Sequence, residues 1–126
     1  MFHPLRKVML IVLVLAIGPA YAETPFDQSG FDRLQKEGKS ILVSIHADWC
    51  PTCKAQGPVV SELLKTPEFK EVSAMRVDFD KQKDVVKRFK VRYQGTLIVF
   101  KGGKEQGRSL GDTDQKDIAA LLRKSL

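Results

Sequence analysis

Two cysteines separated by two residues are the side chains of this chain best suited to chemistry. Cys50 and Cys53 are the only cysteines among the 126 residues, and they lie in the segment Trp49-Cys50-Pro51-Thr52-Cys53-Lys54. An apolar run precedes them and a helical pattern follows, so we expect a helix to begin near Cys50. The free N–H groups and the dipole of that helix would stabilise the Cys50 thiolate and lower its pKa from about 8.5. Cys53, one turn later, could then attack a mixed disulfide formed by Cys50, so the spacing suits reversible thiol–disulfide exchange.

The first 22 residues predict a secretory signal. Arg6 and Lys7 precede eleven apolar residues, Val8 to Gly18, and Ala20-Tyr21-Ala22 forms a small-x-small cleavage site. Eleven helical residues span about 16 Å, half the hydrocarbon thickness, which favours a cleaved signal over a retained membrane anchor. We expect residues 1–22 to be removed by cleavage after Ala22 and residues 23–126 to form one exported domain, periplasmic in a bacterium, without stable membrane insertion.

Charge and cysteine content narrow the function further. The formal net charge is +6, and removal of Arg6 and Lys7 with the signal leaves +4. Because acidic residues are interleaved with the basic ones, we expect no nucleic-acid partner. A structural bridge between Cys50 and Cys53 would close a very short loop and add little stability, whereas a domain of this length can bury its own core. A redox role is therefore favoured over a structural one for the cysteine pair. Separately, we expect the protein to be a monomer.

Hydrophobic periodicity predicts the elements that position the cysteines. Near-continuous apolar residues at 41–47 indicate a strand buried on both faces, and further strands are expected at 74–79, 96–101 and 105–110. Helices are expected at 31–38, 50–65, 81–90 and from Asp112 or Thr113 to 122, with a kink at Pro58. Residues 23–30 are expected to be mobile. This order predicts an α/β fold with a central mixed four-stranded sheet and helices on both faces.

The chain resembles the thioredoxin superfamily in five features that occur in order along nearly all of residues 23–126. They are the buried strand at 41–45, the Ala47–Lys54 motif, Pro58 five residues after Cys53, the Val77–Asp80 strand end and the Thr96–Gly103 hairpin. The Ala47-Asp48-Trp49-Cys50 form is also similar to the C-terminal domain of the bacterial transmembrane disulfide reductases.

The resemblance implies a thioredoxin fold and a protein-disulfide oxidoreductase that needs no cofactor. Its partners would be protein disulfides or thiols and a membrane redox protein. Cys50 would be the exposed nucleophile and Cys53 the partly buried resolving thiol. The residues that shape the site would be Trp49, Pro51, Thr52, Gly95 and Thr96. The chain is too short for the inserted helical domain of the dedicated periplasmic oxidants, so we favour a reductase or electron relay.

Two positions depart from the family. Gly95 stands where thioredoxins place a cis-proline before Thr96. A cis bond without proline costs roughly 2.5–4 kcal/mol, so we expect a trans Gln94–Gly95 bond and a docking groove that is altered, wider or more mobile. Ser44 stands where the family usually has a buried aspartate below the resolving cysteine. Proton transfer at Cys53 would then need water, Ser44 or a nearby group such as Asp48.

Three further residues could tune the pKa of the cysteines, namely His46, Asp48 and Lys54. As an imidazolium, His46 would favour the thiolate; as a neutral ring it could join Cys50 and Cys53 in a copper or zinc site. That metal-binding or metal-delivery module is the alternative function. A partly buried histidine with a satisfied hydrogen bond is the simpler interpretation of His46. The intact motif argues against a redox-inert docking domain.

Overall fold

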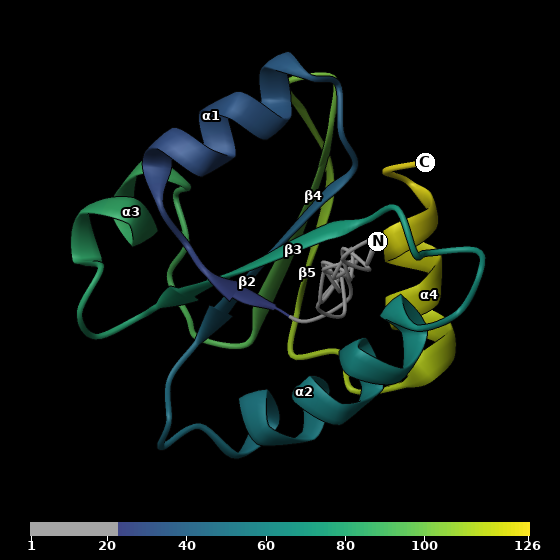
Figure 1. Ribbon diagram of the computed structural model, residues 1–126. Helices are drawn as coiled ribbons and strands as arrows, with labels where there is room; N and C mark the ends of the chain where they lie inside the picture. The colour runs from purple at the N-terminus through teal and green to yellow at the C-terminus, as the bar shows by residue number, and fades with distance from the viewer. Residues whose placement is uncertain (1–22) are drawn as a thin grey trace, which may run out of the picture.

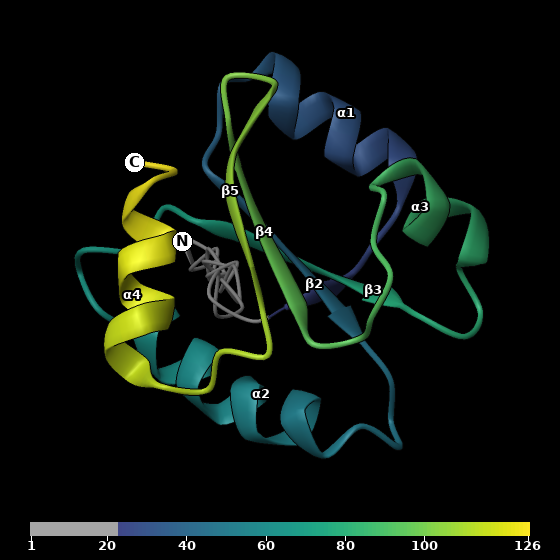
Figure 2. The ribbon, with the colours of Figure 1, turned by 180° about the vertical axis from the view of Figure 1, so that it is seen from behind.

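A five-stranded mixed sheet with helices on both faces makes up the computed structural model, which describes residues 23–126 (Figures 1 and 2). Its strands are β1 Thr24–Pro25, β2 Ile41–His46, β3 Ser73–Asp78, β4 Thr96–Lys101 and β5 Lys104–Leu110. Its helices are α1 Gln28–Lys36, α2 Pro51–Leu64, α3 Lys83–Arg88 and α4 Gln115–Arg123. The strand order is β1-β3-β2-β4-β5; β1, β3 and β2 run parallel, whereas β4 is antiparallel to both β2 and β5.

Strand β2 lies at the centre of the sheet and is buried on both faces, as its apolar sequence predicts. Because successive side chains of a strand point to opposite faces, Leu42 packs on one side and Val43 on the other. The Leu42 side is covered by α2 and α4, and the Val43 side by α1 and α3. Ser44 therefore faces α2, the helix that carries the cysteines.

The sheet has one strand more than the sequence predicted, and the segment that contains it is ordered. Thr24 and Pro25 pair with β3 as the edge strand β1. Asp27 then caps α1 by accepting a hydrogen bond from the Gly30 N–H at 2.6 Å, a bond that lowers the pKa of the Asp27 carboxyl. The prediction that residues 23–30 are mobile is wrong, because a two-residue strand carries no periodic signal that a sequence reading could detect.

Asp114 is the N-cap of α4, where the sequence suggested Asp112 or Thr113; its carboxylate accepts the N–H groups of Lys116 and Asp117. The other predicted elements agree with the observed ones to within a few residues. Among the helices of residues 23–126, none combines the length and the apolar character that a membrane span requires.

Candidate active site

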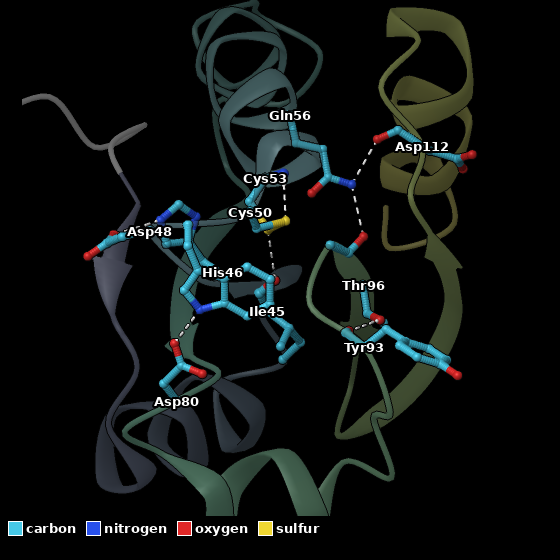
Figure 3. The surroundings of a disulfide bond; sticks show 12 residues. Ile45, His46, Asp48, Cys50, Cys53, Gln56, Asp80, Tyr93, Thr96 and Asp112 are labelled. Carbon is cyan, nitrogen blue, oxygen red and sulfur yellow. Dashed lines mark hydrogen bonds and ion pairs between the residues drawn. A yellow bond between two sulfur atoms is a disulfide. The ribbon is translucent and has the colours of Figure 1, made fainter.

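The cysteine pair lies at the N-terminus of α2, directly after the loop that leaves β2 (Figure 3). Cys50 is the N-cap of the helix, and its Sγ accepts a hydrogen bond from the Cys53 N–H at 3.1 Å. Pro51 occupies the first turn, where its missing N–H costs nothing. The two cysteines form a disulfide with their Cα atoms 5.3 Å apart, an ordinary separation for such a bond. The predicted helix start therefore places the pair as expected.

Both cysteines are buried in the disulfide form. Cys50 is 1% exposed and Cys53 is 3% exposed, and they pack with Ala47 and the ring of Phe79. The prediction of an exposed Cys50 is wrong for this form, because Cys50 packs in a cluster with Ala47, Cys53 and Phe79. A redox partner must therefore displace neighbouring atoms before it can reach Cys50.

Two aromatic side chains near the site are exposed, Trp49 at 57% and Tyr93 at 58%. The Trp49 indole N–H donates to Asp80 at 2.7 Å, which holds the ring beside the site instead of in the core. The Tyr93 carbonyl accepts the hydroxyl of buried Thr96 at 2.7 Å, and its own ring points away from the disulfide (Figure 3). Trp49 is thus not a core aromatic, and its predicted role in shaping the docking surface stays a prediction. Tyr93 is a second exposed aromatic residue of this surface, which the sequence did not single out.

Gly95 takes a conformation that proline cannot adopt. Its φ is +82°, and no cis peptide bond occurs in the described residues, as predicted for Gln94–Gly95. Its N–H donates to the Ile45 carbonyl at 2.8 Å, and its carbonyl accepts the Gly111 N–H at 3.0 Å. A Cβ atom at Gly95 would lie 3.4 Å from the Thr52 methyl group. The loop is altered, as predicted, but these bonds do not support greater mobility.

A buried glutamine on α2 fastens this loop to a second one. Gln56 is 4% exposed, and its amide nitrogen donates to the carbonyls of Gly95 at 2.9 Å and Asp112 at 2.8 Å (Figure 3). One side chain thus links the helix of the cysteines to both loops that flank the site. Gln56 could not be predicted from the sequence, because its two acceptors lie 39 and 56 residues further along the chain.

Replacing Gln56 with glutamate is expected to destabilise the protein by about 2 kcal/mol at neutral pH, because an ionised carboxylate cannot donate to the two carbonyls that it faces. The deficit should shrink as the pH falls, since a protonated carboxyl can donate again. Urea unfolding at pH 7 and pH 4.5 measures both effects. Gln56→Met is the control, because it removes the hydrogen bonds without adding a charge. Equal stabilities of the two variants at both pH values would contradict this role.

His46 does not join the cysteines in a cluster of ligands. Its Nε2 atom lies 3.1 Å from a carboxylate oxygen of the fully exposed Asp48. Within residues 23–126, no group of three or more His, Cys, Asp or Glu side chains could hold a metal ion. The metal-binding alternative thus gains no support, and His46 fits the simpler interpretation of a satisfied, partly buried histidine. Lys54 is exposed on the first turn of α2, and its predicted effect on the cysteine pKa stays a prediction.

Two other carboxylates, Glu68 and Glu105, have lowered pKa values. Both belong to ion pairs outside the cysteine site. Hydrogen bonds from Arg123 lower the pKa of Glu68, which follows the C-terminal end of α2. Hydrogen bonds from Arg108 likewise lower the pKa of Glu105 on β5. Both are exposed ion pairs, which contribute little to stability, and neither belongs to the cluster around the disulfide.

Comparison with known proteins agrees with this geometry. The family model described as thioredoxin matches residues 23–124. The chain belongs to the thioredoxin family. A thioredoxin H-type from Fagopyrum esculentum is 36% identical over 81 residues, which is 64% of this chain and 68% of that protein. A thioredoxin from Chlamydia trachomatis is 34% identical over 84 residues, 67% of this chain and 80% of its own length. The crystal structure of Trxlp from Edwardsiella tarda superposes with a TM-score of 0.78 at 34% identity, covering 80% of this chain and 98% of that one.

Membership in the thioredoxin family, together with the Cys50–Cys53 pair, makes this protein a thiol–disulfide oxidoreductase that acts on protein disulfides. Compared with the usual thioredoxin pattern, its site has Gly95 in place of proline and Ser44 in place of a buried acid. The structure provides a carboxylate from elsewhere, because the Ser44 hydroxyl donates to Glu23 Oε1 at 3.2 Å. Glu23, like Gln56, is a residue beside the cysteines that the sequence did not single out.

Proposed function

We propose that this protein is an exported thiol–disulfide reductase or electron relay, which takes electrons from a membrane redox partner and passes them to protein disulfides. The Cys50 thiolate attacks the substrate disulfide and forms a mixed disulfide, while one substrate sulfur leaves as a thiolate. The Cys53 thiolate then attacks Cys50, which releases the second substrate sulfur. Two electrons have moved to the substrate, and the Cys50–Cys53 disulfide awaits reduction by the partner.

The environment of the Cys50 sulfur is the observation that supports electron transfer from this protein to its substrate. The sulfur is almost fully buried, and within residues 23–126 its hydrogen-bond donor is the Cys53 N–H, with no side chain adding a second. Burial disfavours the charged thiolate, whereas the strong oxidants of this chemistry depend on a stabilised reduced form. We infer that this burial offsets the stabilisation that the N-terminus of α2 gives the thiolate. A couple whose thiolate is stabilised less than in the strong oxidants favours its disulfide, so its dithiol form gives electrons away.

The export and the membrane partner are supported by features of the sequence. A basic segment, an apolar stretch and a small-x-small site end at Ala22, and the match to the family model begins at residue 23. An exported compartment is oxidising, so a reductase there needs electrons from across the membrane. The similarity of Ala47-Asp48-Trp49-Cys50 to the transmembrane reductases is consistent with such a supply.

One experiment tests the location and the direction together. Cells of the source organism are quenched with acid, free thiols are alkylated with a maleimide of known mass, and the intact protein is weighed by mass spectrometry. We expect a chain that begins at Glu23 and carries two maleimide groups. A chain that retains residues 1–22 in the cytosolic fraction would contradict the export, and a mature chain without maleimide would contradict the reducing direction.

A further inference from the structure

The resolving cysteine has to lose a proton in a place that solvent does not reach. Cys53 attacks the mixed disulfide as a thiolate, so the thiol must first pass its proton to an acceptor. Its sulfur is buried and lies 3.8 Å from the Ile45 carbonyl oxygen. A peptide carbonyl is too weak a base to accept the thiol proton. An acceptor therefore has to lie within reach of Cys53 inside the protein.

A small cavity beneath Cys53 leads to a carboxylate. The cavity measures about 10 Å³, and its walls include Cys53, Ser44, Glu23, His46 and Arg76. That volume is about what one water molecule needs, and the polar walls offer it hydrogen-bond partners. A single water could thus join the thiol of Cys53 to the hydroxyl of Ser44.

Glu23 is held so that its carboxylate completes this path. Ser44 and Arg76 are directly opposite each other in the register of β2 and β3. One carboxylate oxygen of Glu23 accepts the Ser44 hydroxyl at 3.2 Å, and the other accepts Arg76 Nε at 2.8 Å. The Glu23 side chain is only 11% exposed, although it belongs to the residue just before the edge strand β1. Arg76 therefore fixes the carboxylate with its second oxygen turned toward Ser44.

We propose that Glu23 is the proton acceptor for Cys53, acting through Ser44 and one water molecule. When Cys53 attacks, its thiol proton passes to the water, the water gives a proton to the Ser44 oxygen, and the Ser44 hydroxyl proton moves to Glu23. The Cys53–Cys50 bond forms, the bond from Cys50 to the substrate sulfur breaks, and that sulfur leaves as a thiolate. Because Glu23 acts through other groups, it is a positioning residue and not a catalytic one. The inference rests on the disulfide exchange and does not depend on the direction in which electrons flow; after cleavage at Ala22, Glu23 would be the first residue and its α-amino group a further charge near the path.

Other charged groups lie close to this path. Arg76 and His46 line the cavity itself, and Asp48 and Asp78 line the neighbouring surface pocket that Glu23 also borders. The Nε2 atom of His46 is paired with a carboxylate oxygen of Asp48 at 3.1 Å. Removal of the Glu23 charge alone, at constant shape, isolates its contribution from theirs.

The test follows the two thiol-transfer steps separately. Each protein is produced with Ala22 kept before position 23, so that the amide of Glu23→Gln cannot cyclise onto a terminal amine. The protein is reduced and mixed with 5,5′-dithiobis(2-nitrobenzoate) in a stopped-flow spectrometer from pH 5 to pH 9. The first nitrothiolate released reports the attack of Cys50, and the second reports the attack of Cys53. Glu23→Gln keeps the shape of the side chain and an oxygen for Ser44 but cannot take up the proton.

We expect Glu23→Gln to leave the rate of the first release within about twofold of the wild-type rate. The rate of the second release should fall by roughly tenfold to 100-fold below pH 7, because loss of a general base usually costs that much or more. The difference should vanish near about pH 9, where the thiol ionises unaided. Ser44→Ala should behave in the same way, whereas Ser44→Thr keeps the hydroxyl and should stay close to the wild type. Glu68→Gln removes the exposed ion pair with Arg123 and controls for the loss of a surface charge.

Three outcomes would overturn the inference. A second release at the wild-type rate in Glu23→Gln would show that Cys53 does not depend on this carboxylate. A slowing by the same factor at every pH, together with a lower Tm, would assign Glu23 a purely structural role as an anchor for β1. A wild-type protein that releases no nitrothiolate at all would contradict the exchange activity itself, and the proton path with it.

Discussion

Replacing Cys50 with serine is expected to reduce disulfide exchange to the uncatalysed background, because a serine hydroxyl neither ionises near neutral pH nor forms a mixed disulfide. Replacing Cys53 with serine should instead leave the first attack intact and halt the reaction at the mixed disulfide. The two variants differ from the wild type by one atom each, so any difference between them reflects the separate roles of the two sulfurs.

Each variant is first reduced and freed of small thiols, then mixed with a protein that contains a disulfide, and the mixture is quenched with an alkylating agent and analysed by non-reducing electrophoresis. Cys53→Ser should accumulate a protein–substrate adduct that reducing agent dissolves, and Cys50→Ser should form none. An adduct of similar yield with Cys50→Ser would mean that Cys53 is the attacking thiol, which would reverse the assignment made from the N-cap position of Cys50.

Replacing Gly95 with proline is expected to destabilise the protein by about 3 kcal/mol or more, even though proline is the residue usual at this position in the family. Proline fixes φ near −65°, whereas Gly95 has φ +82°. It would also remove the N–H that donates to the buried Ile45 carbonyl at 2.8 Å. For a domain of about 100 residues, the loss corresponds to a Tm lower by roughly 12–24 °C.

Gly95→Ala is the matched variant, because it keeps the N–H and meets Thr52 at an ordinary contact distance. We expect it to cost only about 1–2 kcal/mol, the strain of a left-handed backbone. Thermal unfolding followed by the fluorescence of Trp49, the only tryptophan, measures both variants. A Gly95→Pro protein as stable as the wild type would mean that the loop can adopt the cis-proline form at no cost, against the hydrogen bonds described here.

Much of the fold could be predicted because its signals are local. The apolar run of β2, the alternation in β3 and the glycine turn between β4 and β5 each depend on neighbouring residues, and all four strands lie within a residue of where periodicity placed them. The helix start at the cysteines is local as well, since an N-cap and the proline after it are adjacent in the chain.

Contacts between distant segments could not be predicted in this way. The amide of Gln56 reaches two loops far along the chain, and Glu23 meets Ser44 only because β1 pairs with β3. Neither residue belongs to a motif, and each reads as an ordinary polar residue until the sheet register brings its partner close. The burial of Cys50 belongs to the same class, because it depends on how the loop packs against Phe79.

The sequence by itself thus determined which two atoms exchange electrons and which element carries them, because spacing and helix capping act within one turn of chain. Only the tertiary structure decided how deeply the two sulfur atoms are buried and which hydrogen bonds hold the loop at Gly95. It also decided which carboxylate lies near Cys53. Those properties depend on strand register and packing, which bring together residues 21 to 56 positions apart.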